Sequence, residues 1–472
     1  MRYRLSVFLF VLCCAGMPAA HAQYTLVDAY SPLTFSIPLD IQNAGDARMF
    51  VVEKGGLIHV IDGGVASTFL DLSARISIKR ESGTLGLAFP PDHAQTGHFF
   101  VFYTQAAPHR SVISRFTTVA GNPNLGDPAS ELRLLEIDKL EYNHNGGQLV
   151  VDPHEMTLYI SVGDDRTDAN AQDPSSFHGS ILRIDPFNPS GGRNYGIPDQ
   201  NPWRSRPGWR QEIFAIGLRN PWRMGLDPVR STLWVGDVGE TRFEEIDQVR
   251  RGGNYGWPLM EAQSCYEPVS CDTAGANLEA PVHYYPRSEG IAVIGGRVYR
   301  GRVLWQLIGK YVYGDYTGGK IWALDADHPT SPGVQEIVTG APGLLCTGVD
   351  TEGEIYFGST DGTIYRLEST VTGALPPAAS ERGELGAPFP NPFNPTVHLP
   401  VRTPAGSRAS LRIHDVSGAL MAVLMEGRPG PLDTTVRWDG RTRSGIAAAG
   451  VYFAVLEVDG AVVARRRLVL IK

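Results

Sequence analysis

The stretch LVVDPHEMTLYISVGDD (149–165) decides the fold, because it holds two runs of mostly apolar residues on either side of an Asp-Pro turn. Short apolar runs bounded by turn residues are typical of antiparallel β-strands. Related stretches recur along the chain, at 41–56, 87–104, 224–240 and 348–362, with a looser copy at 298–319. The repetition predicts one strand-turn-strand unit used many times.

A second pattern follows several of these copies. It begins with Gly, alternates apolar and polar residues, and ends on an acid, as in GGLIHVID (55–62), GSILRID (179–185), GKIWALD (319–325) and GTIYRLE (362–368). Six copies over about 330 residues favour a six-bladed β-propeller with four strands in each blade. We therefore predict an all-β fold, with this propeller over residues 23–370. Uneven spacing predicts insertions in the third and fourth blades, and such insertions commonly build binding sites.

The C-terminal part has a different character. Residues 371–386 are rich in Pro, Ala, Gly and Glu and are predicted to form a linker. Residues 387–472 contain short strand patterns between Gly, Asp and Pro turns, which predicts a small immunoglobulin-like β-sandwich. This segment has ten Arg and one Lys against four Asp and two Glu, a net charge of +5, whereas the whole chain is at −8. The change of sign supports an independent module.

The N-terminus has the features of a secretory signal over residues 1–22, with early arginines, an apolar run and Ala-His-Ala before Gln23. We therefore expect a secreted or cell-surface protein, with the periplasm as an alternative location. The negative charge argues against nucleic acid as a partner. In an exported protein, Cys265 and Cys271 are expected to form a local disulfide, and Cys346 is expected to be a buried apolar residue.

His144 is the first candidate for chemistry. It lies between two Asn residues and before Gly146-Gly147, just ahead of a predicted strand. A neutral imidazole in this position could act as a general base, with Asp164 as the carboxylate that orients it. The alternative is a turn histidine that bonds only to the backbone. Arg219 could bind an anionic ligand through its guanidinium fork, or it could be a structural arginine stacked on Trp222. The acidic stretch 237–247 could supply oxygen ligands for Ca²⁺ or form a solvated edge.

The signatures of serine hydrolases, zinc proteases, P-loop NTPases and nicotinamide-binding enzymes do not occur in the sequence. The motifs that do occur have a known order. HNGGQL, SVGDD, HGSILRID, GLRNPWR, DVGETRFEEID and GGNYGWP together resemble the glucose/sorbosone dehydrogenase family over about residues 40–370. The resemblance implies a six-bladed propeller that binds pyrroloquinoline quinone (PQQ) and Ca²⁺ and oxidises a sugar hydroxyl at the anomeric carbon.

The resemblance also assigns roles residue by residue. His144 matches the general base, and Asp164 matches its supporting carboxylate. Arg219 and Asn220 match the residues that bind the quinone. Glu81 matches a polar position near the substrate, and Lys320 is the candidate basic residue for the quinone. Gly239 and Glu240 match the loop that holds the cofactor Ca²⁺, and Glu245 and Tyr255 match positions tied to a structural Ca²⁺.

One departure from the family pattern concerns the last two blades, where sugar-oxidising members carry basic residues against the quinone. The matching stretches here are 311–322, in which Lys320 is the candidate, and 343–353, which contains no arginine.

The leading hypothesis is a PQQ- and Ca²⁺-dependent aldose dehydrogenase that passes electrons to an unknown acceptor. The alternatives are a non-catalytic Ca²⁺-binding propeller that binds a protein or glycan at the same face, and a Ca²⁺-dependent hydrolase.

The tail shows a second resemblance. PFPNPFNPTVHLPV, IHDVSGAL, WDGRTRSGIAAAGVYF and the final LVLIK are similar to FlgD-type immunoglobulin-like modules and to the sorting domains of type IX secretion substrates. This resemblance implies that the secretion machinery is a partner of residues 387–472.

Overall fold

The computed structural model describes residues 24–266, 271, 273, 275–370, 383–404, 406–415, 418–430, 432–442 and 445–471. The predicted signal peptide and most of the predicted linker lie outside these ranges. The chain divides into two compact units, Met1–Val371 and Thr372–Lys472. Nearly all regular structure is β-strand, so the predicted all-β class is confirmed. In the ranges above, no helix has the length and apolar character needed to cross a membrane.

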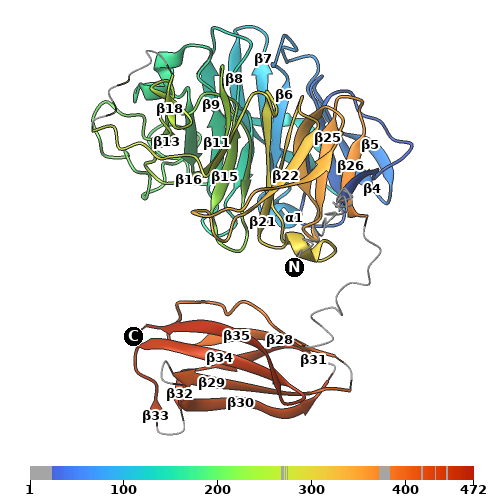
Figure 1. The fold of residues 1–472 in the computed structure, drawn as a ribbon. Coiled ribbons are helices and arrows are strands. Elements are labelled where there is room, and N and C mark those ends of the chain that lie inside the picture. The colour runs from blue at the N-terminus through green and yellow to red at the C-terminus, as the bar shows by residue number, and fades with distance from the viewer. Residues whose placement is uncertain are drawn as a thin grey trace, which may run out of the picture. The chain divides into compact units, whose positions relative to one another are not determined.

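The described part of unit 1 contains six four-stranded antiparallel sheets (Figure 1). The first three are β2(Pro38–Asn43)-β3(Met49–Glu53)-β4(Leu57–Asp62)-β5(Val65–Asp71), β6(Thr84–Ala88)-β7(His98–Gln105)-β8(Arg110–Val119)-β9(Asn122–Asp138) and β10(Leu149–Val151)-β11(Leu158–Val162)-β12(Ser180–Ile184)-β13(Ile213–Ile216). The other three are β14(Pro221–Leu226)-β15(Leu233–Asp237)-β16(Phe243–Val249)-β19(His283–Pro286), β20(Val293–Val298)-β21(Lys310–Asp315)-β22(Lys320–Asp325)-β23(Gln335–Thr339) and β24(Leu344–Val349)-β25(Ile355–Ser359)-β26(Ile364–Ser369)-β1(Tyr24–Asp28). Short elements lie between strands of one sheet: α1(His93–Thr96) between β6 and β7, and β17(Met260–Glu261) and β18(Ser264–Cys265) between β16 and β19.

The first strands of these sheets contact one another in chain order. Strand β2 contacts β6, β6 contacts β10, β10 contacts β14, β14 contacts β20 and β20 contacts β24, and β24 contacts β2. The last sheet contains both ends of the unit, because β1 pairs with β26 from Tyr24↔Ser369 to Asp28↔Tyr365. The N-terminal strand thus covers an edge that would otherwise expose unpaired N–H and C=O groups.

Two of the repeated Asp-Pro turns form the same local structure, whereas the copy at 87–104 forms the short helix α1. The Asp152 carboxylate accepts the backbone N–H of His154 at 2.9 Å, and the Asp227 carboxylate accepts that of Val229 at 3.0 Å. Such Asx turns let Asp end one strand and start a reversal. The turns join the first and second strands of their sheets, as the repeat predicts.

Several strands are covered on both faces. Every residue is buried in the middle strands β3, β11, β12, β15 and β25 and in the first strand β6. Each sheet packs face to face against two neighbouring sheets, so both faces of these strands are buried. This explains why a run such as MFVV is continuously apolar, whereas a half-exposed strand would alternate apolar and polar residues. Polar side chains therefore lie at the ends of the first strands and in the loops that lead into them.

Unit 2 contains a three-stranded and a four-stranded antiparallel sheet within its described residues. These are β27(Glu384–Leu385)-β28(Val397–Thr403)-β31(Leu432–Trp438) and β30(Leu420–Pro429)-β29(Arg408–Asp415)-β34(Gly450–Val458)-β35(Ala461–Leu470), with a small pair β32(Arg441–Thr442)-β33(Gly445–Ile446). One core cluster joins both larger sheets, with Leu399 and Trp438 from the first and Leu411 and Leu456 from the second. Unit 2 therefore has its own hydrophobic core.

Candidate functional site

Three loops and one strand end bring the polar candidates together. Glu81, His144 and Asn220 precede the first strands β6, β10 and β14, and Asp164 follows β11. His144 has a left-handed backbone with φ of 53°. Its carbonyl lies against Gly163, where an added Cβ would come within 2.4 Å of the carbonyl oxygen. Only glycine at 163 allows the two loops to approach this closely.

His144 and Asp164 form a buried pair. The imidazole Nδ1 lies 2.6 Å from Asp164 Oδ1, and the two side chains are 7% and 0% exposed. A carboxylate only accepts hydrogen bonds, so Nδ1 carries the proton in this pair and Nε2 of a neutral ring keeps its lone pair. Asp164 also accepts the Trp257 indole N–H at 2.9 Å and the Arg166 backbone N–H at 2.8 Å. The carboxylate is therefore fixed on several sides.

Glu81 connects His144 with Asn220. Its Oε2 accepts the backbone N–H of His144 at 2.8 Å and the Asn220 amide at 3.4 Å. The Asn220 Oδ1 in turn accepts the backbone N–H of Gly146 at 3.1 Å. These bonds bring together four of the residues predicted from the sequence: Glu81, His144, Asp164 and Asn220.

Arg219 is placed beside this group. Asp237 accepts the backbone N–H groups of Arg219 and Asn220 at 2.9 and 2.7 Å. Burial raises the pKa of the Asp237 carboxyl to about 7, although these two donors act to lower it. The Arg219 guanidinium lies 5.5 Å from the centre of the Trp257 ring, donates to the Val238 carbonyl at 2.8 Å and pairs with Glu240.

A small cavity of about 290 Å³ lies next to these residues. Its walls include Glu81, Asn220, Trp222, Tyr316 and Leu345. The Trp222 indole N–H donates to the Leu345 carbonyl at 2.9 Å, so the ring has a fixed orientation. Two aromatic rings and two polar side chains suit a flat or ring-shaped ligand with a few polar groups.

Lys320 is placed elsewhere. It begins β22, and its ammonium lies 3.2 Å from Glu336 and 4.0 Å from Glu289. It does not line the cavity described above. The structure therefore does not bring Lys320 together with Arg219 and Asn220.

The four predicted calcium positions already have protein partners. The Gly239 carbonyl accepts Arg287 Nη1 at 3.2 Å, and the Glu240 carboxylate pairs with Arg219. Glu245 Oε1 accepts the Ala262 N–H at 2.6 Å, and the Tyr255 hydroxyl donates to the Gln248 carbonyl at 2.8 Å. Within the described ranges, no group of three or more His, Cys, Asp or Glu side chains is arranged to hold a metal ion.

One buried acid beside Glu245 has no partner in the described structure. Both carboxylate oxygens of Asp247 are buried and make no hydrogen bond. Asp247 lies two residues after Glu245 in β16, on the same face of the strand. Burial and the charges of Asp247 and Asp237 raise the pKa of Glu245 well above its ordinary value.

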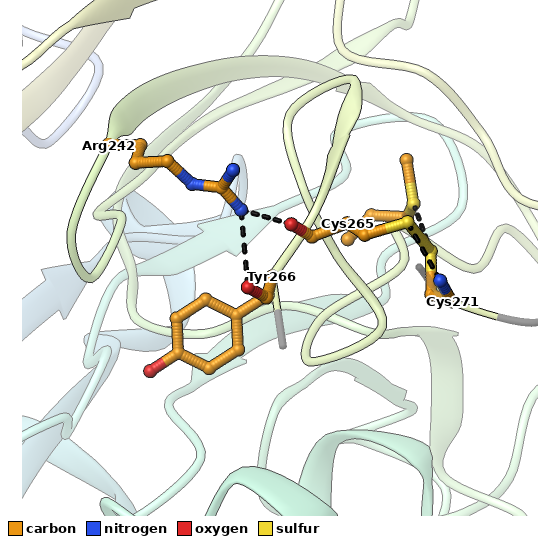
Figure 2. The surroundings of a disulfide bond; sticks show 5 residues. Arg242, Cys265, Tyr266 and Cys271 are labelled. Carbon is orange, nitrogen blue, oxygen red and sulfur yellow. Dashed lines mark hydrogen bonds between the residues drawn. A yellow bond between two sulfur atoms is a disulfide. The ribbon is translucent and has the colours of Figure 1, made fainter. Parts of the chain in front are cut away.

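Cys265 and Cys271 form a disulfide with a Cα–Cα distance of 5.5 Å (Figure 2). Arg242 donates to the backbone carbonyls of Cys265 and Tyr266. Arg242 also lies 3.5 Å from Glu261, whose carboxylate accepts backbone N–H groups of the loop after β15. The disulfide segment and the 240–242 loop are thus joined. Cys346 is a buried free cysteine.

Trp257 and Tyr316 are not among the predicted site residues, and Trp222 enters only as a ring on which Arg219 could stack. The Arg219 guanidinium lies over Trp257 instead, and Arg223 lies 4.3 Å from the Trp222 ring centre. Trp257 stands in GGNYGWP and Trp222 in GLRNPWR. The signal that could have found them is aromatic residues inside otherwise polar loop motifs, because an indole N–H inside a polar site commonly serves as a donor.

The fold places the chain in a class of all-β proteins whose solved members include sugar dehydrogenases. The PQQ-bound aldose sugar dehydrogenase of Streptomyces coelicolor has a TM-score of 0.59 and 21% identity, over 74% of this chain and 98% of that one. This likeness shows a shared fold. The chain belongs to the Glucose / Sorbosone dehydrogenase family, whose profile matches residues 35–366.

Two relatives show how broad this family is. HIPL1 protein of Arabidopsis thaliana is 30% identical over 336 residues, which cover 57% of this chain and 47% of that protein. Aldose sugar dehydrogenase YliI of Escherichia coli is 27% identical over 303 residues, covering 61% and 78%. The matched region thus spans about half the length of HIPL1.

Proposed function

We propose that this protein is an exported dehydrogenase that oxidises an aldose-type sugar with PQQ and Ca²⁺, and that the six sheets of unit 1 are the blades of a propeller. The observation that carries the proposal is the buried His144–Asp164 pair, with 2.6 Å between Nδ1 and Oδ1, joined through Glu81 to Asn220 at a small cavity. Membership of the Glucose / Sorbosone dehydrogenase family supports this chemistry.

His144 would act as the general base. The free lone pair on Nε2 takes the proton of the sugar hydroxyl, and the imidazolium that forms is stabilised by the Asp164 carboxylate. The Trp257 indole and the Arg166 N–H hold that carboxylate at the required angle. Glu81 would hydrogen-bond the remaining sugar hydroxyl groups at the cavity wall.

The residues around the cavity fit a quinone. Arg219 lies beside the cavity and not in its wall, and its buried Nε has no hydrogen-bond partner in the described structure, so this donor is not used by the protein. Trp222 and Tyr316 offer aromatic walls to a flat ring, and Asn220 adds an amide. When bound, PQQ supplies the two-electron acceptor that the oxidation requires. Lys320 would contribute to quinone binding only if its ammonium group broke the ion pair with Glu336.

Calcium would be held by oxygen atoms that now have other partners. The Gly239 carbonyl and Glu240 carboxylate would bind it beside the cofactor after giving up Arg287 and Arg219. Glu245 and the loop of Tyr255 would bind a structural ion, and the unpartnered buried carboxylate of Asp247 suits a divalent cation nearby.

The termini would determine where the protein acts. We propose that residues 1–22 are a signal peptide and that residues 387–472 form an immunoglobulin-like module of the FlgD type, read by the secretion machinery. The separate core of unit 2 and its net charge of +5 over 387–472 support an independent module.

The test is a titration of the chain from Gln23 to Lys472 with PQQ, with and without Ca²⁺, followed by quinone absorbance. We expect stoichiometric, Ca²⁺-dependent binding and reduction by at least one member of an aldose panel. His144→Ala should keep quinone binding and lose reduction, whereas His328→Ala, at an exposed histidine, should keep both. Absence of binding at micromolar protein would contradict the proposal.

A second candidate is a non-catalytic propeller that binds a protein or glycan at the same face. The placement of Lys320 favours it, because this ammonium pairs with Glu336 and Glu289 instead of facing the cavity. Such a protein would not bind PQQ, so the same titration separates the two functions.

A further inference from the structure

A long insertion in the third sheet builds a surface that the His144 site does not use. Residues 185–212 connect β12 to β13. Arg115 donates to the Pro186 carbonyl at 2.9 Å, and the Asn194 amide donates to the Arg133 carbonyl at 2.7 Å. The Asn201 amide donates to the Arg183 and Gln211 carbonyls, each at 2.8 Å. Both ends of the insertion are therefore anchored to strands.

A groove of about 600 Å³ lies along this insertion. Its walls include Phe177, Arg193, Tyr195, Arg206, Trp209 and Arg210. None of these residues lines the cavity near Asn220. The volume is in the range of sites that hold small organic ligands, about 300–1,000 Å³.

Two arginines of the groove rest on aromatic rings. The Arg206 guanidinium lies 4.7 Å from the Trp209 ring centre, and Trp209 stacks at 4.3 Å on Trp203. The Arg210 guanidinium lies 4.5 Å from the Phe177 ring centre and donates through Nε to the Ser175 carbonyl at 2.8 Å. A guanidinium stacked on a ring keeps its edge N–H groups free for a planar anion such as a carboxylate.

The acids of the groove are already neutralised. Glu212 accepts the Tyr195 hydroxyl at 2.8 Å and lies 3.5 Å from Arg193. Glu136 lies 2.6 Å from Arg133. Across the described ranges, Arg206 and Arg210 have no carboxylate within ion-pair distance. The groove thus offers two positive charges on a chain whose net charge is −8.

We propose that this groove binds an acidic saccharide, a chain of sugar rings that carry carboxylates. Two guanidinium forks bind carboxylates bidentately. Phe177 and Trp209 are only partly buried beside these guanidinium groups, so the part of each ring that is left uncovered can contact sugar C–H groups. An acidic peptide would use the arginines but not the rings. The site is separate from the proposed dehydrogenase site and stands or fails independently of it.

The test is calorimetric titration of the chain from Gln23 to Lys472 with trigalacturonate, maltotriose and triglutamate at one ionic strength. We expect trigalacturonate to bind at least tenfold more tightly than triglutamate. Maltotriose is itself an aldose that the proposed dehydrogenase site could take, so any maltotriose binding should be unchanged in Arg206→Gln/Arg210→Gln. The double variant Arg206→Gln/Arg210→Gln should weaken trigalacturonate binding at least tenfold.

The matched control is Arg204→Gln/Arg230→Gln, which removes the same charge at arginines paired with Asp199 and Asp327. It should bind like the wild type, as should His144→Ala. If the double groove variant unfolds, Arg206→Lys keeps the charge, loses the fork and should still bind more weakly. Unchanged binding in the groove variants, equal affinity for triglutamate, or loss of binding in His144→Ala would overturn the proposal.

Discussion

His144 combines a left-handed backbone with a buried side chain. A non-glycine residue in that region costs about 1–3 kcal/mol, and such strain collects at functional sites. The surroundings hold the residue there through the Glu81 bond to its N–H and the Asp164 bond to its ring. The conformational cost of the left-handed backbone at His144 points to a role for the imidazole beyond packing.

Replacing His144 by Gln keeps a polar side chain of similar size but removes the proton acceptor. If the proposed function is correct, kcat for sugar oxidation falls by about 10²–10⁴-fold, the usual contribution of a general base. Quinone affinity stays within about threefold, because His144 makes no bond to Arg219 or Asn220 side chains. Steady-state kinetics beside a binding titration measure both. A variant that retains wild-type kcat would remove His144 from the mechanism.

Replacing Trp257 by Phe removes one donor to Asp164 and keeps the ring under Arg219. Without the indole N–H, the Asp164 carboxylate has one hydrogen bond fewer to fix its orientation toward His144. We expect kcat to fall about tenfold, as for loss of an outer partner of a catalytic group. A kcat that matches the wild type would assign Trp257 to packing alone.

The grouping of His144, Asp164, Glu81 and Asn220 could be expected from the sequence, because each lies at a strand end in a recognisable motif. The position of Lys320 could not be expected from the sequence. Its partner Glu336 lies on β23, and the register of the β22–β23 pair shifts between Ile321 and Trp322 of β22. Cross-strand partners depend on register, which the local sequence does not determine.

Among the elements, β1 has the most direct effect on stability. Tyr24 is 2% exposed and packs in a cluster with strands of the last two sheets. Its sequence, YTLVD, indicates a strand, but nothing local indicates that it pairs with 365–369. By contrast, the first two strands of each sheet overlap copies of the first repeat, and GKIWALD, a copy of the second pattern, contains β22.

Deleting residues 24–28 should therefore destabilise unit 1 and promote association. The deletion exposes the edge of β26 and removes a buried Tyr, which alone costs about 3–5 kcal/mol by analogy with other large aromatic truncations. Thermal unfolding and light scattering measure the two effects. The control is Val27→Thr, at a side chain 38% exposed, which should change the melting temperature by less than about 2 °C. A deletion variant with the melting temperature of the wild type would contradict the idea that β1 stabilises unit 1 by covering the edge of β26.

At the level of the whole molecule, buried histidines link stability to pH. Burial lowers the pKa of His93, His178 and His283 below 6.5. At a pH just below 6.5 the unfolded chain therefore binds more protons than the folded one. Stability is fully present above that pH and falls as the pH drops toward the folded pKa values.

We expect the melting temperature to decline between pH 7 and pH 5. Each proton taken up on unfolding corresponds to about 1.4 kcal/mol per pH unit. His283→Phe, which keeps an aromatic ring near Tyr285 and Tyr313, should make the decline shallower. A parallel decline in wild type and variant would remove His283 from the effect.

The pairing of β1 with β26 also sets an order of events during synthesis. Tyr24 is made long before its partner Ser369, which lies near the end of unit 1. The last sheet thus stays incomplete until almost the entire unit has left the ribosome. If the protein is exported as proposed, this late pairing would keep unit 1 from completing its fold while translocation is still under way.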